Sequence, residues 1–406
     1  MEKSMTKHPQ PRRLVVLLCA VGLGAWAAPS LADVQYKFSG FGTLGAAKTN
    51  TDETEFRTSV EQVRGAGRKP DLGVDSKLAA QGSAIFSNGV TLTSQVLGSR
   101  RGGEEFELGF EWAYAQYTGI DGLDVKAGRV VLPAFLVSDS RLVGYATPWL
   151  RVSPLVYAMM PLSNVDGGQA TVRHAFGPVV VSGQLTYGNS TGSSSGVTAV
   201  PNMVMGMVGG DPVYYQQNTT KTETNNIHGF NVAVEWGDWT VRASQISDRT
   251  NINISLITPP PYLLIGQPAT LDSSKSFKDK FTEFGLQYDD GKTVVMAEHV
   301  SRSTSDEKVQ DSKGWYIAAG YRFDSVMPYV MVSEYKETFT ISEGGLPPKA
   351  KGLAFGARYE LGGSVALKAE LAQYKNNSTY IFTDTASPSV ANKKINVMSV
   401  ALDFVF

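Results

Sequence analysis

The segment from Gly128 to Arg173 reads GRVVLPAFLVSDSRLVGYATPWLRVSPLVYAMMPLSNVDGGQATVR and separates two strand-like stretches. It is far too long for a hairpin turn, and a compact domain rarely keeps such a loop without a function. Its four prolines exclude a central strand. Its few charges, of both signs, should face water or one another, because burying them unpaired is costly. We interpret residues 130–168 as a loop that folds into the lumen of a barrel and narrows a water-filled pore.

The first 32 residues have the features of a secretory signal peptide. Basic residues precede a 15-residue largely apolar run, Leu14 to Ala28, and Ser30-Leu31-Ala32 offers the small residues that a signal peptidase recognises. A transmembrane anchor would need about 20 apolar residues, so this run is too short for one. Cys19 would suit a lipoprotein signal, but Leu18 stands where that processing site needs a small residue. Cleavage would leave residues 33–406, which we expect to form a single barrel domain.

The remaining chain would carry 33 Lys and Arg against 37 Asp and Glu. This balance argues against a nucleic-acid partner. The only cysteine leaves with the signal peptide, so the exported chain has no disulfide framework. No later run of 18 apolar residues occurs, which excludes helical membrane spans.

Alternation of apolar and polar residues with period two recurs from end to end, as half-buried strands require. In the last strand Met398, Val400 and Leu402 share one face, while Ser399 and Asp403 fall on the other. In the same way, one apolar face of a strand is predicted to contain Phe106, Leu108, Phe110, Trp112 and Tyr114. One apolar face of another strand is predicted to contain Trp315, Ile317, Ala319, Tyr321 and Phe323.

Sixteen strands can be placed, with connections that alternate between short and long. The predicted strands are 35–47, 73–86, 90–100, 106–117, 123–129, 169–176, 179–188, 228–236, 239–247, 281–289, 292–302, 314–323, 328–339, 351–361, 364–375 and 394–406. Glycine-rich pairs such as Gly177-Pro178 and Asp290-Gly291 predict tight turns. The long connections are 48–72, 130–168, 189–227, 248–280 and 376–393. An even number of strands with short turns at one end predicts an all-β, transmembrane antiparallel β-barrel.

Particular segments strengthen this interpretation. They are Tyr36-Lys37-Phe38-Ser39-Gly40-Phe41-Gly42, Gly128-Arg129, Ser138-Asp139-Ser140, Val143-Gly144-Tyr145-Ala146, Trp149-Leu150-Arg151, Gly356-Ala357-Arg358-Tyr359-Glu360-Leu361, Ala366-Leu367-Lys368-Ala369-Glu370 and the terminal Phe406. With them, the chain resembles a Gram-negative outer-membrane porin of the sixteen-stranded kind, in a divergent subgroup. The resemblance implies an inward third loop, a homotrimer, and a C-terminal aromatic residue that the barrel-assembly machinery of the outer membrane recognises.

Charged residues of the loop and of the inward strand faces are the candidate pore-lining groups. The loop contributes Asp139, Arg141, Arg151 and Asp166, and strand parity adds Arg173, Arg242, Arg322, Arg358, Lys368 and Glu370. Arg129 shares parity with the outward residues Leu123 and Val125, so its place in the pore follows from the family resemblance alone. The alternative for all of them is structural: ion pairs that fix the loop to the wall, or positions in a wide solvated lumen.

The predicted function is passive diffusion of small hydrophilic solutes and ions across the outer membrane. No thiol, Gly-x-Ser-x-Gly or His-Glu-x-x-His motif supports catalysis, and no cofactor or metal is implied. A barrel lipase, and an adhesin or anchor with a plugged lumen, are the alternatives. The loop lacks the dense acidic cluster of many porins, so the sequence leaves both the preferred ion and the solute open.

Overall fold

A computed structural model describes residues 34–62, 64–101, 105–194, 204–208, 211–257, 270–305, 311–338, 349–376, 381–384 and 393–406. The expected signal peptide lies outside these residues. No helix in the described ranges is long and apolar enough to cross a bilayer.

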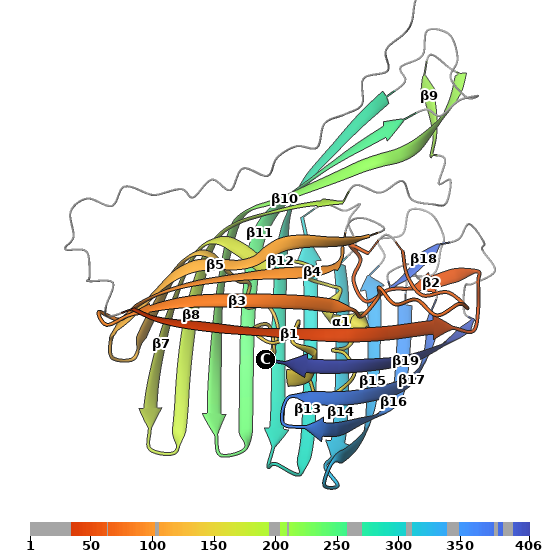
Figure 1. Ribbon diagram of the computed structural model, residues 1–406. Helices are drawn as coiled ribbons and strands as arrows, with labels where there is room; N and C mark the ends of the chain where they lie inside the picture. The colour runs from red at the N-terminus through yellow and green to blue at the C-terminus, as the bar shows by residue number, and fades with distance from the viewer. Residues whose placement is uncertain are drawn as a thin grey trace, which may run out of the picture.

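Strands make up nearly all of the regular structure (Figure 1). They are β1 (Val34–Thr49), β2 (Thr54–Phe56), β3 (Lys77–Phe86), β4 (Val90–Arg100), β5 (Phe106–Ile120), β6 (Leu123–Val131), β7 (Asn164–Phe176), β8 (Val179–Ser194), β9 (Val204–Val208), β10 (Asp211–Trp236), β11 (Trp239–Ile257), β12 (Thr270–Asp289), β13 (Thr293–Thr304), β14 (Asp311–Tyr321), β15 (Val326–Thr338), β16 (Lys349–Gly362), β17 (Val365–Asn376), β18 (Phe382–Asp384) and β19 (Lys394–Val405). Two short helical turns, η2 (Gly144–Ala146) and α1 (Pro154–Tyr157), lie between β6 and β7.

The sheet closes on itself because β1 pairs with both β3 and β19. Of its 17 strands, β9 pairs only with β10, which leaves a ring of sixteen antiparallel strands. A separate small sheet joins β2 to β18. The ring confirms the predicted barrel, in which every strand has two neighbours and no edge is left to face lipid.

Burial follows the predicted alternation in most strands. In β19, Met398 and Val400 are 49% and 51% exposed on the outer face, whereas Ser399 and Asp403 are buried inside. The outward face predicted for β14 is confirmed as well, with Ile317 and Tyr321 exposed and Tyr316 buried.

The single outward face predicted from Phe106 to Tyr114 is wrong beyond Phe110. The register of β4 against β5 shifts between Gln95 and Val96, so Glu111 is an extra residue in β5. Such a bulge reverses the parity of the residues that follow it. Phe106 and Phe110 therefore face outward, while Tyr114 faces inward and packs against the buried core.

Two predicted long loops are in part strands. Residues 189–194 continue β8, residues 211–227 begin β10, and the following hairpin extends β11 to Ile257 and starts β12 at Thr270. These extensions are rich in Thr, Ser and Asn, and the only clear alternation in them is Ile252, Ile254 and Leu256 of β11. Backbone pairing forms strands there although the apolar pattern is weak. The short turns agree with the prediction, and Gly177, Gly237 and Gly291 take positive φ there.

Phe406 extends the pairing between β1 and the end of the chain, the seam at which the barrel closes. Its backbone N–H donates to the Gly40 carbonyl at 3.0 Å, and the Gly40 N–H donates to the Phe406 carbonyl at 2.8 Å. The Phe406 ring lies over Gly40 and the Phe404 ring over Gly42, so a side chain at either glycine would collide with it. Aromatic rings on cross-strand glycines stabilise a sheet where its edge lacks side chains.

We predict that deleting Phe406 lowers the unfolding free energy of the barrel by about 2 kcal/mol, since it removes two backbone hydrogen bonds of about 1 kcal/mol each. Urea unfolding of the refolded protein measures the effect. Phe406→Leu keeps the backbone bonds and should lose less stability. An unfolding midpoint for the deletion equal to that of the wild type would contradict this account of the seam.

Candidate functional site: the loop across the lumen

Residues 132–163, called here the inward loop, cross the interior of the barrel between β6 and β7. The strands extend slightly further than predicted, so this loop is shorter than the expected 130–168. Its short helix α1 contacts β14, β15 and β16. Trp149 and Phe135 are fully buried, with ring centroids 5.3 Å from Tyr329 of β15 and 5.3 Å from Phe281 of β12, respectively. The aromatic residues thus pack the loop against the wall, as the sequence indicated.

Lys368 of β17 is the most completely enclosed anchor of the loop. Its ammonium donates to the carbonyls of Gly144, Thr147 and Trp149 at 2.7, 2.7 and 2.9 Å. It also pairs with the Asp403 carboxylate at 2.9 Å, and both side chains are 0% exposed. An ammonium has three protons and needs acceptors for all of them when buried. The loop backbone supplies those acceptors, so this lysine fixes the loop.

Arg151 attaches the loop to both sides of the seam, through Asp75 just before β3 and through Glu370 of β17. Its Nη2 and Nε donate to the Asp75 carboxylate at 2.7 and 2.9 Å, and its Nη1 donates to Glu370 at 2.9 Å. Burial would lower the pKa of Arg151, but the Asp75 and Glu370 carboxylates raise it above the ordinary value. A buried guanidinium with bidentate pairing is a strong structural contact. These contacts favour the loop-fixing alternative for Arg151 and Glu370.

Two further wall arginines hold loop carbonyls. Arg242 of β11 donates to Pro133 at 2.5 Å, and Arg358 of β16 donates to Tyr145 and Thr147 at 2.6 and 3.0 Å. Arg358 also lies over the Tyr145 ring at 4.7 Å, the distance of a cation–π contact. Both were candidates for the pore lining, and both have donors committed to the loop.

A buried carboxylate completes the attachment on β13. Glu298 accepts hydrogen bonds from the hydroxyls of Tyr157 and Tyr316 at 2.5 and 2.7 Å, and from the Leu136 N–H at 2.9 Å. Sequence reasoning missed it, although its inward parity in β13 was a usable signal. Glu283 on the adjacent β12 is also fully buried, and neither of its carboxylate oxygens has a hydrogen-bond partner among the described residues.

Arg129 and Asp166 do not meet across the pore. They pair with each other at 2.7 Å, as direct cross-strand neighbours in β6 and β7. The register of β6 is regular from Val125 to Arg129, and the adjoining Val130 is buried against the inward loop. No bulge brings Arg129 inward, so the pair keeps the outward parity by register, yet Arg129 also lines the cavity of about 510 Å³ beside the inward loop. Its place in the pore lining stays a prediction.

The other predicted residues lie nearer the short-turn end or in the loop. Arg173 pairs with Glu235 at 2.8 Å with both side chains well exposed, and Arg322 pairs with Asp289 at 2.6 Å. Asp139 is exposed in the inward loop. Of these three, Arg322 lines a space beside the anchor Arg358.

Open space remains beside the inward loop. A cavity of about 510 Å³ is lined by Glu61, Arg101 and Glu107 on one side and by Met160 and Pro161 of the loop on the other. An adjoining space of about 170 Å³ shares Glu61 and Arg101 and adds Arg141. A third space, of about 330 Å³, lies under the loop near Arg322 and Arg358. The loop therefore narrows the lumen without filling the space on either side.

The spaces lined by Glu61, Arg101 and Arg141 are called here the narrow section, and these three charged residues come from three separate segments of the chain. Arg101 pairs with the buried Glu111 at 2.5 Å, and Arg141 donates to the carbonyls of Met160 and Pro161. Burial raises the pKa of Glu61, and the positive charges of Arg101 and Arg141 oppose that rise. Glu61 belongs to the loop after β2, which the sequence gave no reason to place in the lumen.

A closed sixteen-stranded barrel with a loop fastened across a partly open, charged lumen defines a channel-forming membrane barrel. A family model described as Gram-negative porin matches residues 16–379, and the chain belongs to that family. The family and the fold support an outer-membrane channel. No curated protein matches the chain.

Solved structures share the fold at low sequence identity. An anion-selective porin from Comamonas acidovorans is 13% identical with a TM-score of 0.56, over 92% of this chain and 100% of that one. A trimer form of OmpT, an outer membrane protein of Vibrio cholerae, is 12% identical with a TM-score of 0.55, over 92% and 99%. Salmonella typhi OmpF in complex with daunomycin is 12% identical with a TM-score of 0.53, over 92% and 98%.

We predict that Lys368→Met destabilises the barrel by about 3–5 kcal/mol, because it leaves Asp403 as a buried, unpaired charge. It also frees three loop carbonyls, so single-channel recordings should show larger and noisier conductance. Lys37→Met, at an exposed position, is the matched control. Adding Asp403→Asn should restore part of the stability and leave the noise. Wild-type stability together with a quiet channel would show that Lys368 does not hold the loop.

Proposed function

We propose that the protein is a porin for passive diffusion of small hydrophilic solutes and ions, with the inward loop as its constriction. The observation that carries the proposal is the fastening of that loop by buried cations beside open, charged space. A loop so fixed keeps the width of the passage constant. A solute would enter at the long loops, pass Glu61, Arg101 and Arg141, and leave at the short turns, driven only by its gradient.

Selectivity in this proposal comes from charges of both signs in one narrow section. Two unit charges 4 Å apart interact with an energy of about 4 kcal/mol at an effective dielectric constant of 20, which is far more than in bulk water. Low-dielectric walls focus the field, so one charge at the constriction counts for more than several in a wide vestibule. Glu61 from the first loop and Arg141 from the inward loop lie there, which makes selectivity a joint property of two loops.

The adhesin or anchor alternative requires a plugged lumen. The cavities on both sides of the inward loop favour a channel instead. Swelling of liposomes that contain the purified protein, in isotonic solutions of small sugars, separates the two. Swelling supports diffusion, and its absence would support the anchor.

Export and assembly are part of the same proposal. Residues 1–32 would act as a signal peptide, and Phe406 would be recognised by the barrel-assembly machinery. A homotrimer is supported by the trimer form of the Vibrio cholerae relative.

We predict opposite changes in ion preference from two substitutions in the narrow section. Arg141→Gln should shift permeability severalfold toward cations, and Glu61→Gln should shift it severalfold toward anions, because each removes one charge from the narrow section. Reversal potentials in a planar bilayer under a salt gradient measure both. The shifts should shrink near 1 M salt, where the screening length falls to about 3 Å.

The matched control neutralises the exposed ion pair of Arg68 and Asp52, Arg68→Gln with Asp52→Asn, which lines none of the spaces beside the inward loop, and it should leave the reversal potential unchanged. If the control alters ion preference while Arg141→Gln and Glu61→Gln do not, the constriction lies elsewhere.

We also predict a pH dependence of ion preference that originates at Glu61. The pKa of its carboxyl group is raised above 4.5 by burial, so the group loses its negative charge at a higher pH than an exposed glutamate. As the pH falls, the wild-type channel should therefore become more anion-preferring before ordinary carboxylates titrate. Glu61→Gln should lack this step in a pH series of reversal potentials. The same step in wild type and variant would assign it to another group.

A further inference from the structure

Two cations and one carboxylate of the narrow section lack an ion-pair partner in the part of the chain that the structure describes. They are Lys77 at the start of β3, Arg141 of the inward loop and Glu61 of the loop after β2. All three line the same space of about 170 Å³, and all three side chains are half-buried. They therefore face the passage with their charges uncompensated by the protein.

Two other cations beside this space are neutralised by protein carboxylates. Arg100 pairs with Asp71 at 2.9 Å, and Arg101 pairs with Glu111 at 2.5 Å. Both carboxylates belong to the protein itself, so neither arginine leaves a full charge for a solute.

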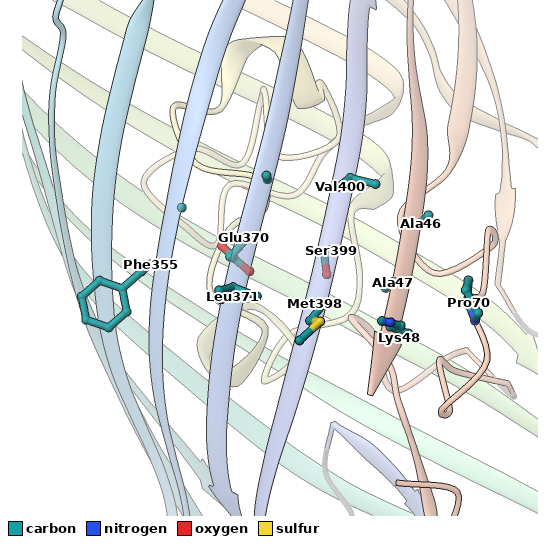
Figure 2. Close-up of a pocket in the computed structure, with 12 residues that line it drawn as sticks. Ala46, Ala47, Lys48, Pro70, Phe355, Glu370, Leu371, Met398, Ser399 and Val400 are labelled. Carbon is teal, nitrogen blue, oxygen red and sulfur yellow. The ribbon is translucent and has the colours of Figure 1, made fainter. Parts of the chain in front are cut away.

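The wall holds Arg151, the remaining cation beside this space. Its guanidinium pairs with Asp75 and Glu370 at 2.7 and 2.9 Å, and it also donates to the Ser399 hydroxyl at 2.6 Å. Glu370 and Ser399 are register partners on the adjacent strands β17 and β19 (Figure 2). Arg151 thus serves the attachment of the inward loop, which leaves Lys77 and Arg141 as the cations that a solute can meet.

The three uncompensated charges are close enough to act on one another. The charge of Arg141 repels that of Lys77 and attracts the carboxylate of Glu61. Arg141 donates to the carbonyls of Met160 and Pro161 at 3.3 and 3.2 Å, which fixes its position without neutralising its charge. The ammonium of Lys77 can donate three hydrogen bonds, and its partners are not supplied by the described residues.

We propose that the narrow section binds acidic α-amino acids, with their two carboxylates on Lys77 and Arg141 and their ammonium on Glu61. The inference rests on the function proposed above, because it names the solute class that the same passage favours. The space is several times the roughly 30 Å³ that one water molecule occupies in the liquid, and it adjoins the cavity of about 510 Å³. A solute of amino-acid size therefore fits.

The sign of the three charges distinguishes this class from simpler solutes. An inorganic anion or a dicarboxylate would bring negative charge beside Glu61 and no cation to pair with it. A basic amino acid would bring two positive charges beside Lys77 and Arg141. Only a solute with two negative charges and one positive charge pairs with all three groups. Weak binding of this kind is compatible with diffusion, since a solute must both enter the site and leave it.

The test uses the full barrel in planar bilayers, with single-channel currents recorded while solute is added. Recordings at pH 8 favour the charged form of Glu61, whose pKa is raised by burial. L-Glutamate should interrupt the current reversibly and in a saturable manner. Glutarate lacks the ammonium and L-norvaline lacks the second carboxylate, so each should bind about tenfold more weakly, as expected for one lost charged contact.

Two variants assign the contacts. Glu61→Gln should abolish the preference for glutamate over glutarate, and Lys77→Gln should weaken the binding of both solutes about tenfold. The matched controls are Asp121→Asn and Lys292→Gln, which remove the same charges from exposed short turns and should bind glutamate like the wild type. If Lys77→Gln forms no channels, Glu61→Gln and the three solutes on the wild type decide the question.

Equal interruption by the three solutes would overturn the inference, and so would an unchanged preference for glutamate in Glu61→Gln. Stronger interruption by glutarate than by glutamate would also overturn it, since that result would indicate a site for anions alone. In all these cases the channel openings of the wild type would still support a porin. A wild-type protein that gives no openings would instead overturn the proposed function itself.

Discussion

The contacts on which the channel depends are those between buried wall cations and the backbone of the inward loop. A loop of this length has few carbonyl groups satisfied by its own helical turns. Inside the barrel those carbonyls need donors, because an unsatisfied buried polar group is costly. Lys368, Arg242 and Arg358 provide them from three separate strands. The same contacts satisfy the cations, so neither partner could be buried alone.

This use of charge separates two roles that look identical in the sequence. An inward lysine or arginine can contact a permeating ion, or all of its donors can be bound by acceptors of the inward loop and the wall. Lys368 and Arg151 are not available to ions, because their donors bind protein acceptors and their side chains are almost completely buried. Arg101 and Arg141 adjoin open space. The ion preference of the channel therefore depends on the charges that remain after the loop has been fastened.

The barrel could be predicted from the sequence because its strands are repetitive. Alternation and glycine-rich turns fix the strand count and the inward or outward direction of most side chains, as in β19. The bulge at Glu111 could not be predicted, since one extra residue leaves no compositional trace. Nor could the roles of Arg151 or Glu61, which depend on where two loops meet inside the lumen. Parity gives the direction of a side chain, whereas its role depends on partners far away in the sequence.

The inner and outer faces of the barrel solve one electrostatic problem in different ways. Antiparallel register places charged residues of neighbouring strands opposite each other on both faces. Inside, Arg358 lies opposite Lys368 in register, and the repulsion is offset by loop carbonyls and by Asp403. Outside, Lys351 lies opposite Lys375, and Glu334 of β15 pairs with Lys351 at 3.3 Å. On the outer face the counter-charge therefore comes from a neighbouring strand of the same sheet, whereas inside it comes from the inward loop and from Asp403.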